Sequence, residues 1–388
     1  MTKCVVEVGP VSIRGPCDVG QDLVSTALGC IDDEIALLDE HPVAVPAIWR
    51  AVFRSALSDC SGTAVLVCPT WWSSTRVEHV REAASDCAAQ VVSLRRAEVL
   101  TAGQPGAPAV VEIAPEFVAI WRSGRVVMAE PRLGEPMDVV RAVANGVGEA
   151  SAVFVDAPID VDGGSSLATA ISARLRADGL AVAIVHQNRV LAGIRDQPRP
   201  LVREPRPRAR WRPRPEVLAA GIVAAGLSCV GLASSFGVHE SDATGVPMTV
   251  LIEGRVAVKV PARWAVQRIT AGPGSARVEV ISPDDATAVL VTQSQVREGE
   301  RLADTAAMLR NALDDQQDGV FSRFNPNDRR ADRPAATYRE VREGRQIDWT
   351  VFVDDTVRIA VGCESAPGRE QAVQDICDEA IRSAHAVI

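Results

Sequence analysis

The chain has 388 residues, 47% of them hydrophobic and 23% charged, and its net charge is −9. This length exceeds that of a typical single domain, so two folded units are expected. The acidic balance argues against nucleic acid as the main partner, because binding a duplex needs a broad basic face that neutralises phosphates.

The first 194 residues are predicted to form a cytoplasmic α/β domain. The opening MTKCVVEVGP lacks the basic start and the apolar stretch of a secretory signal. Helical spacing is found at 46–58, 77–88, 136–147 and 167–177. Strand-like runs lie before, between and after these helical segments, at 4–8, 63–68, 110–113, 117–122, 152–156 and 182–185. This alternation is typical of an α/β arrangement.

Four stretches of this domain, in this order, resemble the actin-like ATPase superfamily, which includes DnaK-type chaperones and sugar kinases. They are VVEVGP at 5–10, VLVCPTWWSSTRVEHVREAA at 65–84, VVEIAPEFVAIWRSGR at 110–125 and VFVDAPIDVDGGSSLATAI at 153–171. The resemblance implies three ligand-binding loops. The first stretch holds the first phosphate loop and the third stretch holds the second phosphate loop. The fourth stretch holds the adenosine loop, which we call the third loop.

The loops depart from an active ATPase pattern. Cradling phosphates takes glycines whose backbone N–H groups approach the oxygens closely. Glu7 stands where the family has a metal-coordinating Asp, Gly9 is followed by Pro10, which has no N–H, and Glu112 replaces the Asp of the second loop. The third loop has Gly163 and Gly164 only after Asp156, Ala157 and Pro158. We therefore expect a degenerate, non-hydrolysing domain with no catalytic residue, no cofactor and no metal, and keep an active ATPase as the alternative.

Residues 195–216 form a linker rich in arginine and proline. It holds eight arginines, and the five nearest its end are Arg206, Arg208, Arg210, Arg212 and Arg214. The prolines favour an extended chain, and the arginines are suited to contact anionic lipid headgroups. A solvated spacer is the alternative.

Residues 217–238 contain no charged side chain. As a helix they would be about 33 Å long, enough to cross ~30 Å of hydrocarbon. The sequence therefore predicts a single transmembrane helix, and a long helix buried in a globular core is the alternative. The positive flank places the N-terminus in the cytoplasm and the C-terminus outside. Small residues recur along it at every fourth position, which predicts a strip for a partner helix unless the pattern is chance. They are Gly221, Ala225, Cys229, Ala233 and Gly237.

Residues 239–388 are predicted to form an extracytoplasmic α+β domain with an antiparallel sheet. The segment MTVLIEGRVAVKV is typical of a hairpin, further alternating strands follow, and two amphipathic helices are expected near 302–313 and 373–381. Cys363 and Cys377 point toward the same predicted core, in a compartment that allows oxidation. A disulfide between them is expected, and two buried free thiols are the alternative.

As a whole, the chain resembles the type VII secretion-associated protein family of ESX clusters in mycobacteria and related actinobacteria. TAVLVCPTWWSSTRVEHVREAA and VGCESAPGREQAVQDICDEAIRSA carry the likeness. The resemblance implies a non-enzymatic membrane accessory or scaffold protein whose partners are other secretion subunits. The alternatives are a nucleotide-binding switch coupled to the membrane and an anchored protein that binds an envelope ligand.

Overall fold

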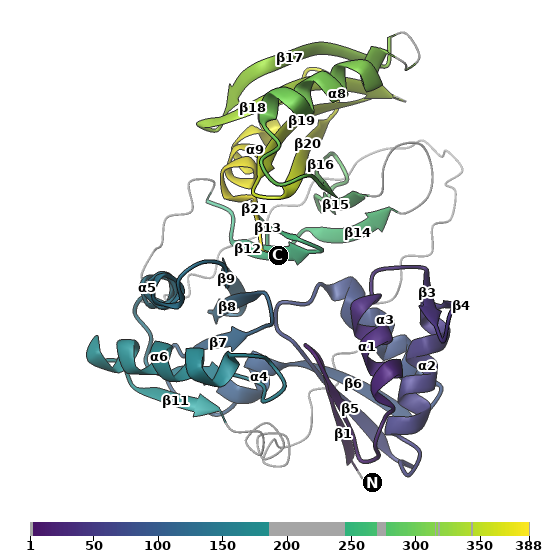
Figure 1. Ribbon diagram of the computed structural model, residues 1–388, viewed down its shortest axis with the longest axis vertical. Helices are drawn as coiled ribbons and strands as arrows, with labels where there is room; N and C mark the ends of the chain where they lie inside the picture. Colours follow the sequence, from purple (N-terminus) through teal and green to yellow (C-terminus); the bar gives the residue numbers. More distant parts are fainter. Residues whose placement is uncertain are drawn as a thin grey trace, which may run out of the picture.

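The computed structural model describes residues 3–185, 245–269, 277–314, 316, 319–342 and 344–387. Residues 3–185 form the N-terminal half, which is the lower part of Figure 1, and residues from 245 onward form the C-terminal half above it. Each half contains more than one β-sheet.

The first sheet of the N-terminal half has the strand order β2-β1-β5-β6. Its strands are β1 (Lys3–Val8), β2 (Ile13–Arg14), β5 (Thr63–Cys68) and β6 (Gln90–Arg95). β1, β5 and β6 run parallel, and β2 is antiparallel to β1. Apolar residues of this sheet and of three helices form one core, namely α1 (Gln21–Gly29), α2 (Val45–Ala56) and α3 (Ser74–Ser85). β5 is buried along its whole length, as expected for a parallel strand covered on both faces.

The second sheet repeats this plan, with the order β11-β10-β7-β8-β9. Its strands are β7 (Ala109–Ile113), β8 (Phe117–Arg122), β9 (Arg125–Pro131), β10 (Val153–Asp156) and β11 (Val182–Val185). In the first sheet, β1 has the antiparallel β2 on one side and the parallel β5 and β6 on the other. In the second sheet, β7 has the antiparallel β8 on one side and the parallel β10 and β11 on the other. α5 (Pro136–Val147) and α6 (Gly164–Ala177) pack on one face of the second sheet. Between the two sheets lies α4 (Arg96–Thr101), whose apolar residues join β5, β7 and β10 in one cluster.

Several predicted elements agree with the structure because their sequence signals are local. The predicted strands at 63–68, 117–122 and 182–185 match β5, β8 and β11 residue for residue. α3 begins after Ser73, whose hydroxyl accepts a hydrogen bond from the Arg76 N–H at 3.3 Å. This is the usual way to satisfy a free N–H group in the first turn of a helix.

The C-terminal half is built on a seven-stranded antiparallel sheet, with the order β14-β15-β16-β20-β19-β18-β17. Its strands are β14 (Ala265–Ile269), β15 (Arg277–Ile281), β16 (Thr287–Gln295), β17 (Phe321–Arg330), β18 (Arg333–Arg342), β19 (Arg345–Asp354) and β20 (Val357–Ser365). A smaller sheet contains β12 (Met248–Glu253), β13 (Val256–Pro261) and β21 (His385–Ala386). The helices are α8 (Leu302–Asp314) and α9 (Gln371–Ser383), and α9 packs against both β20 and β13.

The two halves share a hydrophobic core. Phe117, Val126 and Ala129 of the second sheet cluster with Val250 and Ile252 of β12. Hydrogen bonds cross the same junction, from the Thr249 hydroxyl to the Val126 carbonyl at 3.2 Å and between the His385 ring and the Ala129 carbonyl at 2.9 Å. Figure 1 shows β12 beside β9 at this junction.

The predicted fold class, two domains held apart by a single transmembrane helix, is therefore wrong. The physical reason is direct contact, because groups that share a core and hydrogen bonds cannot lie on opposite sides of ~30 Å of hydrocarbon. Across the described ranges, which end at residue 185 and resume at 245, no helix is long and apolar enough to cross a membrane. The described structure is a mixed α/β protein with several sheets.

The residues on which the membrane prediction depended lie outside the described residues. They are the linker residues Arg206, Arg208, Arg210, Arg212 and Arg214, and the small-residue strip Gly221, Ala225, Cys229, Ala233 and Gly237. Cys363 and Cys377 are described, and they form a disulfide between β20 and α9 with their Cα atoms 6.0 Å apart. A second disulfide, which the sequence did not predict, joins Cys4 to Cys60.

Candidate functional site

Three acidic residues meet where the two sheets of the N-terminal half approach each other. Glu7 lies near the end of β1, Glu112 near the end of β7, and Asp156 ends β10. The carboxyl ends of parallel strands are where α/β folds bind ligands. All three side chains are buried, and all three interact electrostatically with Arg96. The fold therefore brings together Glu7 and Glu112, which sequence analysis assigned to separate loops.

Arg96 fills the space between these carboxylates. It is the first residue of α4, it is 4% exposed, and it forms ion pairs with Asp156 and with Glu7, the latter at 3.7 Å. Burial opposes the positive charge, but Asp156 and Glu7 together hold the pKa of Arg96 above its usual value. The guanidinium therefore stays charged and takes the place of a cation at the centre of the cluster.

Thr70 fixes Glu112 in the same cluster. The Thr70 backbone N–H donates to Glu112 at 3.0 Å, its hydroxyl donates to the other carboxylate oxygen, and that hydroxyl accepts the Ala97 N–H at 2.8 Å. Burial, with the nearby charge of Asp156, raises the pKa of Glu112 to about 7. Glu112 is thus tied to α4, and it does not project toward solvent.

The first loop is closed around Gly9. Its φ of +73° requires glycine, and its N–H donates to the Ser12 carbonyl at 2.9 Å within the turn. A Cβ at Gly9 would lie 3.1 Å from the Trp72 ring and 3.2 Å from Pro69. The Gly9 N–H is therefore already bonded, and Trp72 and Pro69 occupy the space beside Gly9. Neither the donor nor the space is available to a phosphate.

Arg132 holds the second and third loops together. Its guanidinium donates to the carbonyls of Ala114 at 2.8 Å, Pro115 at 2.9 Å and Asp162 at 2.6 Å. Gly163, with φ of +65°, precedes α6, and a Cβ there would lie 3.2 Å from Arg132. A cation thus lies at the helix N-terminus, the end of a helix that favours an anion.

Gly164 is buried against Val161, and a Cβ at Gly164 would lie 3.2 Å from that side chain. An ion pair between Arg14 of β2 and Asp160 joins the first sheet to the third loop. The predicted loop residues therefore lie around one junction of the two sheets, where arginines pair with the acidic side chains and carbonyls.

These residues do not form a binding site for a nucleoside triphosphate and its metal ion. Such a ligand needs several free backbone N–H groups and carboxylates that can reach a cation. Here Glu7 and Asp156 are paired with Arg96, and the Gly9 N–H is bonded within its own turn. Within the described parts of the chain, no group of three or more His, Cys, Asp or Glu side chains is arranged so that it could hold a metal ion.

Sequence analysis did not identify Arg96 and Arg132, the two arginines that hold the residues of this junction together. The only signal for Arg96 is the pair Arg95–Arg96 inside the apolar run VVSLRRAEVL, where a charge is unexpected unless it has a buried partner. Arg132 follows β9 in the sequence and gives no such signal.

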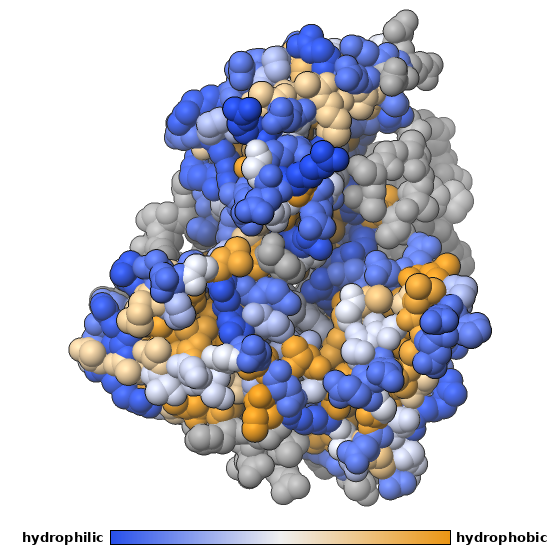
Figure 2. All heavy atoms as spheres, viewed as in Figure 1, coloured by the Kyte–Doolittle hydropathy of each residue, from blue (hydrophilic) through white to orange (hydrophobic). Residues whose placement is uncertain are grey.

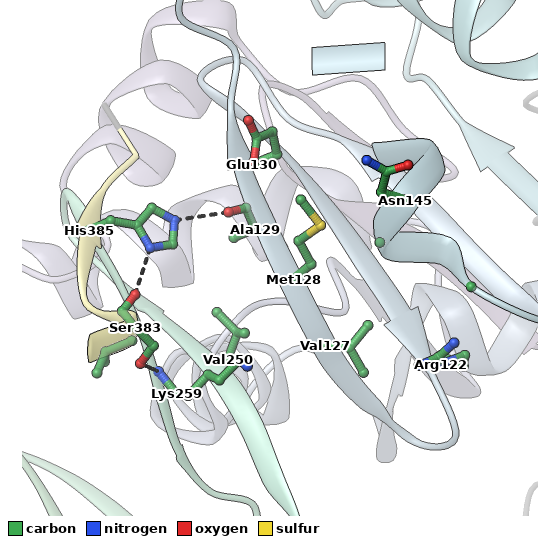
Figure 3. Close-up of a pocket in the computed structure, with 13 residues that line it drawn as sticks. Arg122, Val127, Met128, Ala129, Glu130, Asn145, Val250, Lys259, Ser383 and His385 are labelled. Carbon is green, nitrogen blue, oxygen red and sulfur yellow. Dashed lines mark hydrogen bonds between the residues drawn. The ribbon is translucent and has the colours of Figure 1, made fainter. Parts of the chain in front are cut away.

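A pocket of about 470 Å³ lies at the junction of the two halves (Figure 3). Val127 and Met128 of β9 line it from one side, and Val250 of β12 and His385 line it from the other. Both ring nitrogens of His385 face carbonyl oxygens, those of Ser383 at 2.8 Å and Ala129 at 2.9 Å. None of the predicted loop residues lines this pocket.

No model of a known protein family matches the chain. No curated protein matches it either. Parts of the chain are similar to solved structures. The cyanobacterial PsbP protein (CyanoP) of Synechocystis is 14% identical, with 40% of this chain and 98% of that chain covered and a TM-score of 0.28.

Two further structures show comparable similarity. LpqN, involved in cell envelope biogenesis of Mycobacterium tuberculosis, is 11% identical, with 39% of this chain and 89% of that chain covered and a TM-score of 0.25. The ethanolamine utilization protein EutJ from Carboxydothermus hydrogenoformans is 14% identical, with 47% and 84% covered and a TM-score of 0.26. These similarities are too weak to assign a family or a function.

Proposed function

We propose that this protein is a non-enzymatic, protein-binding scaffold whose N-terminal half is a degenerate actin-like domain. The observation that carries this proposal is Arg96, which is buried between Glu7 and Asp156. An ATPase keeps the carboxylate at the position of Glu7 available for a metal ion, whereas here Glu7 pairs with a fixed guanidinium. Because the interior site is filled by Arg96, the protein would bind its partners through its outer surface.

We further propose that the scaffold acts with a type VII secretion apparatus. The support is the resemblance of two stretches, which form β5 with α3 and β20 with α9. Both stretches contribute helices to the cores of their halves, and α3 also leaves an exposed face. Affinity purification of the full chain from its native cells should recover secretion subunits, and recovery of none would contradict this link.

Calorimetric titration of the full chain with Mg²⁺ and ATP tests the non-enzymatic assignment. We expect no binding heat up to millimolar ATP. Micromolar binding by the wild-type chain would overturn the scaffold proposal and favour the nucleotide-binding switch.

A further inference from the structure

A small hairpin on the N-terminal half exposes one apolar face. It consists of β3 (Ile35–Leu38) and β4 (His41–Ala44), paired only with each other. Ala36 and its partner Val43 pack into the core beneath. On the opposite face Ile35 is 63% exposed and Leu37 is 69% exposed, and neighbouring exposed apolar side chains are typical of an interaction site.

The register of the hairpin extends this apolar face toward a groove. Ile35 is paired with Ala44 and Leu37 with Pro42, and directly paired residues of an antiparallel ladder share a face. All four residues are exposed, and Ala44 also lines a groove of about 880 Å³. Figure 2 shows hydrophobic side chains gathered over this hairpin, at the right of the lower half.

The groove combines an apolar floor with an acidic rim. Val45, Trp49 and Ala83, from α2 and α3, form buried parts of the floor. The rim carries four exposed carboxylates, on Asp33, Glu34, Glu82 and Asp86. The fifth carboxylate that lines the groove is Asp32, which pairs with Arg76 and with Arg268.

The charge of the groove selects the partner. Besides the paired Arg268, the one Lys or Arg that lines the groove is Arg50, whose Nε donates to the Pro46 carbonyl at 3.1 Å. Five carboxylates and two arginines therefore line the groove, which gives it an excess of negative charge, and His79 is the other titratable side chain that lines it. A segment that supplies positive charge to the groove and apolar side chains to the hairpin complements both parts of the surface.

We propose that this surface, which we call the hairpin–groove surface (Ile35, Leu37, Pro42, Ala44 and the four rim carboxylates), binds a partner protein through a segment in which basic residues lie next to apolar ones. The proposal rests on the scaffold function and names the chemistry of the partner. The two proposals are tested separately. Failure to bind such a segment would overturn the proposal for this surface, and it would leave the result of the ATP titration unchanged.

Fluorescence anisotropy with the full chain tests the proposal. The probe is the fluorescein-labelled peptide RKRKLVLV, and its charge-reversed counterpart is EDEDLVLV. We expect binding of the basic peptide with a dissociation constant in the micromolar range, weakened by salt, and no binding of the acidic one. The double variant Ile35→Ser/Leu37→Ser should weaken binding about tenfold or more, because two apolar contacts are lost.

Two further double variants separate charge from general surface effects. Glu82→Gln/Asp86→Asn should weaken binding about threefold to tenfold and reduce its salt dependence. The matched control is Met137→Ser/Ile159→Ser, which removes two equally exposed apolar side chains elsewhere on the N-terminal half and should leave binding unchanged. Because all these positions are exposed, circular dichroism should show the wild-type fold in each variant.

Four outcomes would overturn the proposal. The first is equal affinity for the basic and acidic peptides, and the second is no effect of Ile35→Ser/Leu37→Ser. The third is a dimer of the wild-type chain, seen by analytical ultracentrifugation, that this double variant dissociates, because a second copy would then be the occupant. The fourth is binding only after the arginines of 195–216 are replaced by serine, which would identify the chain's own basic segment as the occupant.

Discussion

Arg96 and Asp156 form an ion pair in which the two residues are only 4% and 2% exposed. Arg96 begins α4, which lies between the two sheets, and Asp156 ends a strand of the second sheet. A charge buried at this depth is stable only when it is paired, so the pair fixes the position of α4 relative to β10.

Replacing Arg96 by Met should destabilise the protein strongly. The change leaves Glu7 and Asp156 buried without their cation, and breaking a buried pair in this way costs about 3–5 kcal/mol. The control is Arg141→Met, which breaks an exposed pair worth less than about 1 kcal/mol. Urea unfolding measures both values, and a loss below about 1 kcal/mol for Arg96→Met would contradict the structural role given to this residue.

Glu112 should make the stability of the protein depend on pH. Burial raises its pKa from 4.5 to about 7 in the folded state. The folded chain then binds this proton more tightly than the unfolded chain, so the free energy of unfolding falls as pH rises from about 4.5 to about 7. The predicted loss is on the order of 3 kcal/mol at pH 8.

Glu112→Gln isolates this effect, because glutamine is uncharged and still offers an oxygen to Thr70. Wild type and variant should be equally stable near pH 4, where the carboxyl is protonated in both states, and the variant should be more stable at pH 8. Urea unfolding across this range is the measurement. A stability difference that does not change with pH would show that the Glu112 carboxylate does not titrate in this way.

The sequence predicts best those elements whose signals are local. The apolar run Thr63–Cys68 and the alternating strands around Val357 lie where expected, because burial on one or both faces imposes a pattern on each strand. β3 and β17 were missed, because Ile35 and Leu37 face outward and Phe321–Arg330 is mostly polar at a sheet edge.

The candidate site could be predicted only in part. Glu7 and Glu112 stand out by their position after apolar strands, but Arg96, which neutralises them, is more than 80 residues from Glu7 in the chain. Such a pair depends on how the two sheets pack, which no local pattern encodes. The shared core of the two halves was missed for the same reason, because Val126 and Ile252 meet only through tertiary packing.

The shared core predicts that the two halves unfold together. Ile252 is 1% exposed and packs with residues of both halves. Ile252→Asp places an unpaired carboxylate in this core, which should cost about 3 kcal/mol or more and split a single thermal transition into two. Differential scanning calorimetry measures this. Val341→Asp, at an exposed apolar position of the same half, is the control and should keep one transition.

The two disulfides should contribute unequally to stability. Cys4 and Cys60 are 56 residues apart, whereas Cys363 and Cys377 are 14 apart. In the chain-entropy account, the longer loop gains more from closure, so Cys4→Ala/Cys60→Ala should cost about 4 kcal/mol and Cys363→Ala/Cys377→Ala about 3 kcal/mol. Guanidinium unfolding measures both, with Cys17→Ala, outside either bridge, as the control. A reducing agent should bring wild type below both double variants, since it opens both bridges, and a midpoint that reductant leaves unchanged would contradict their contribution.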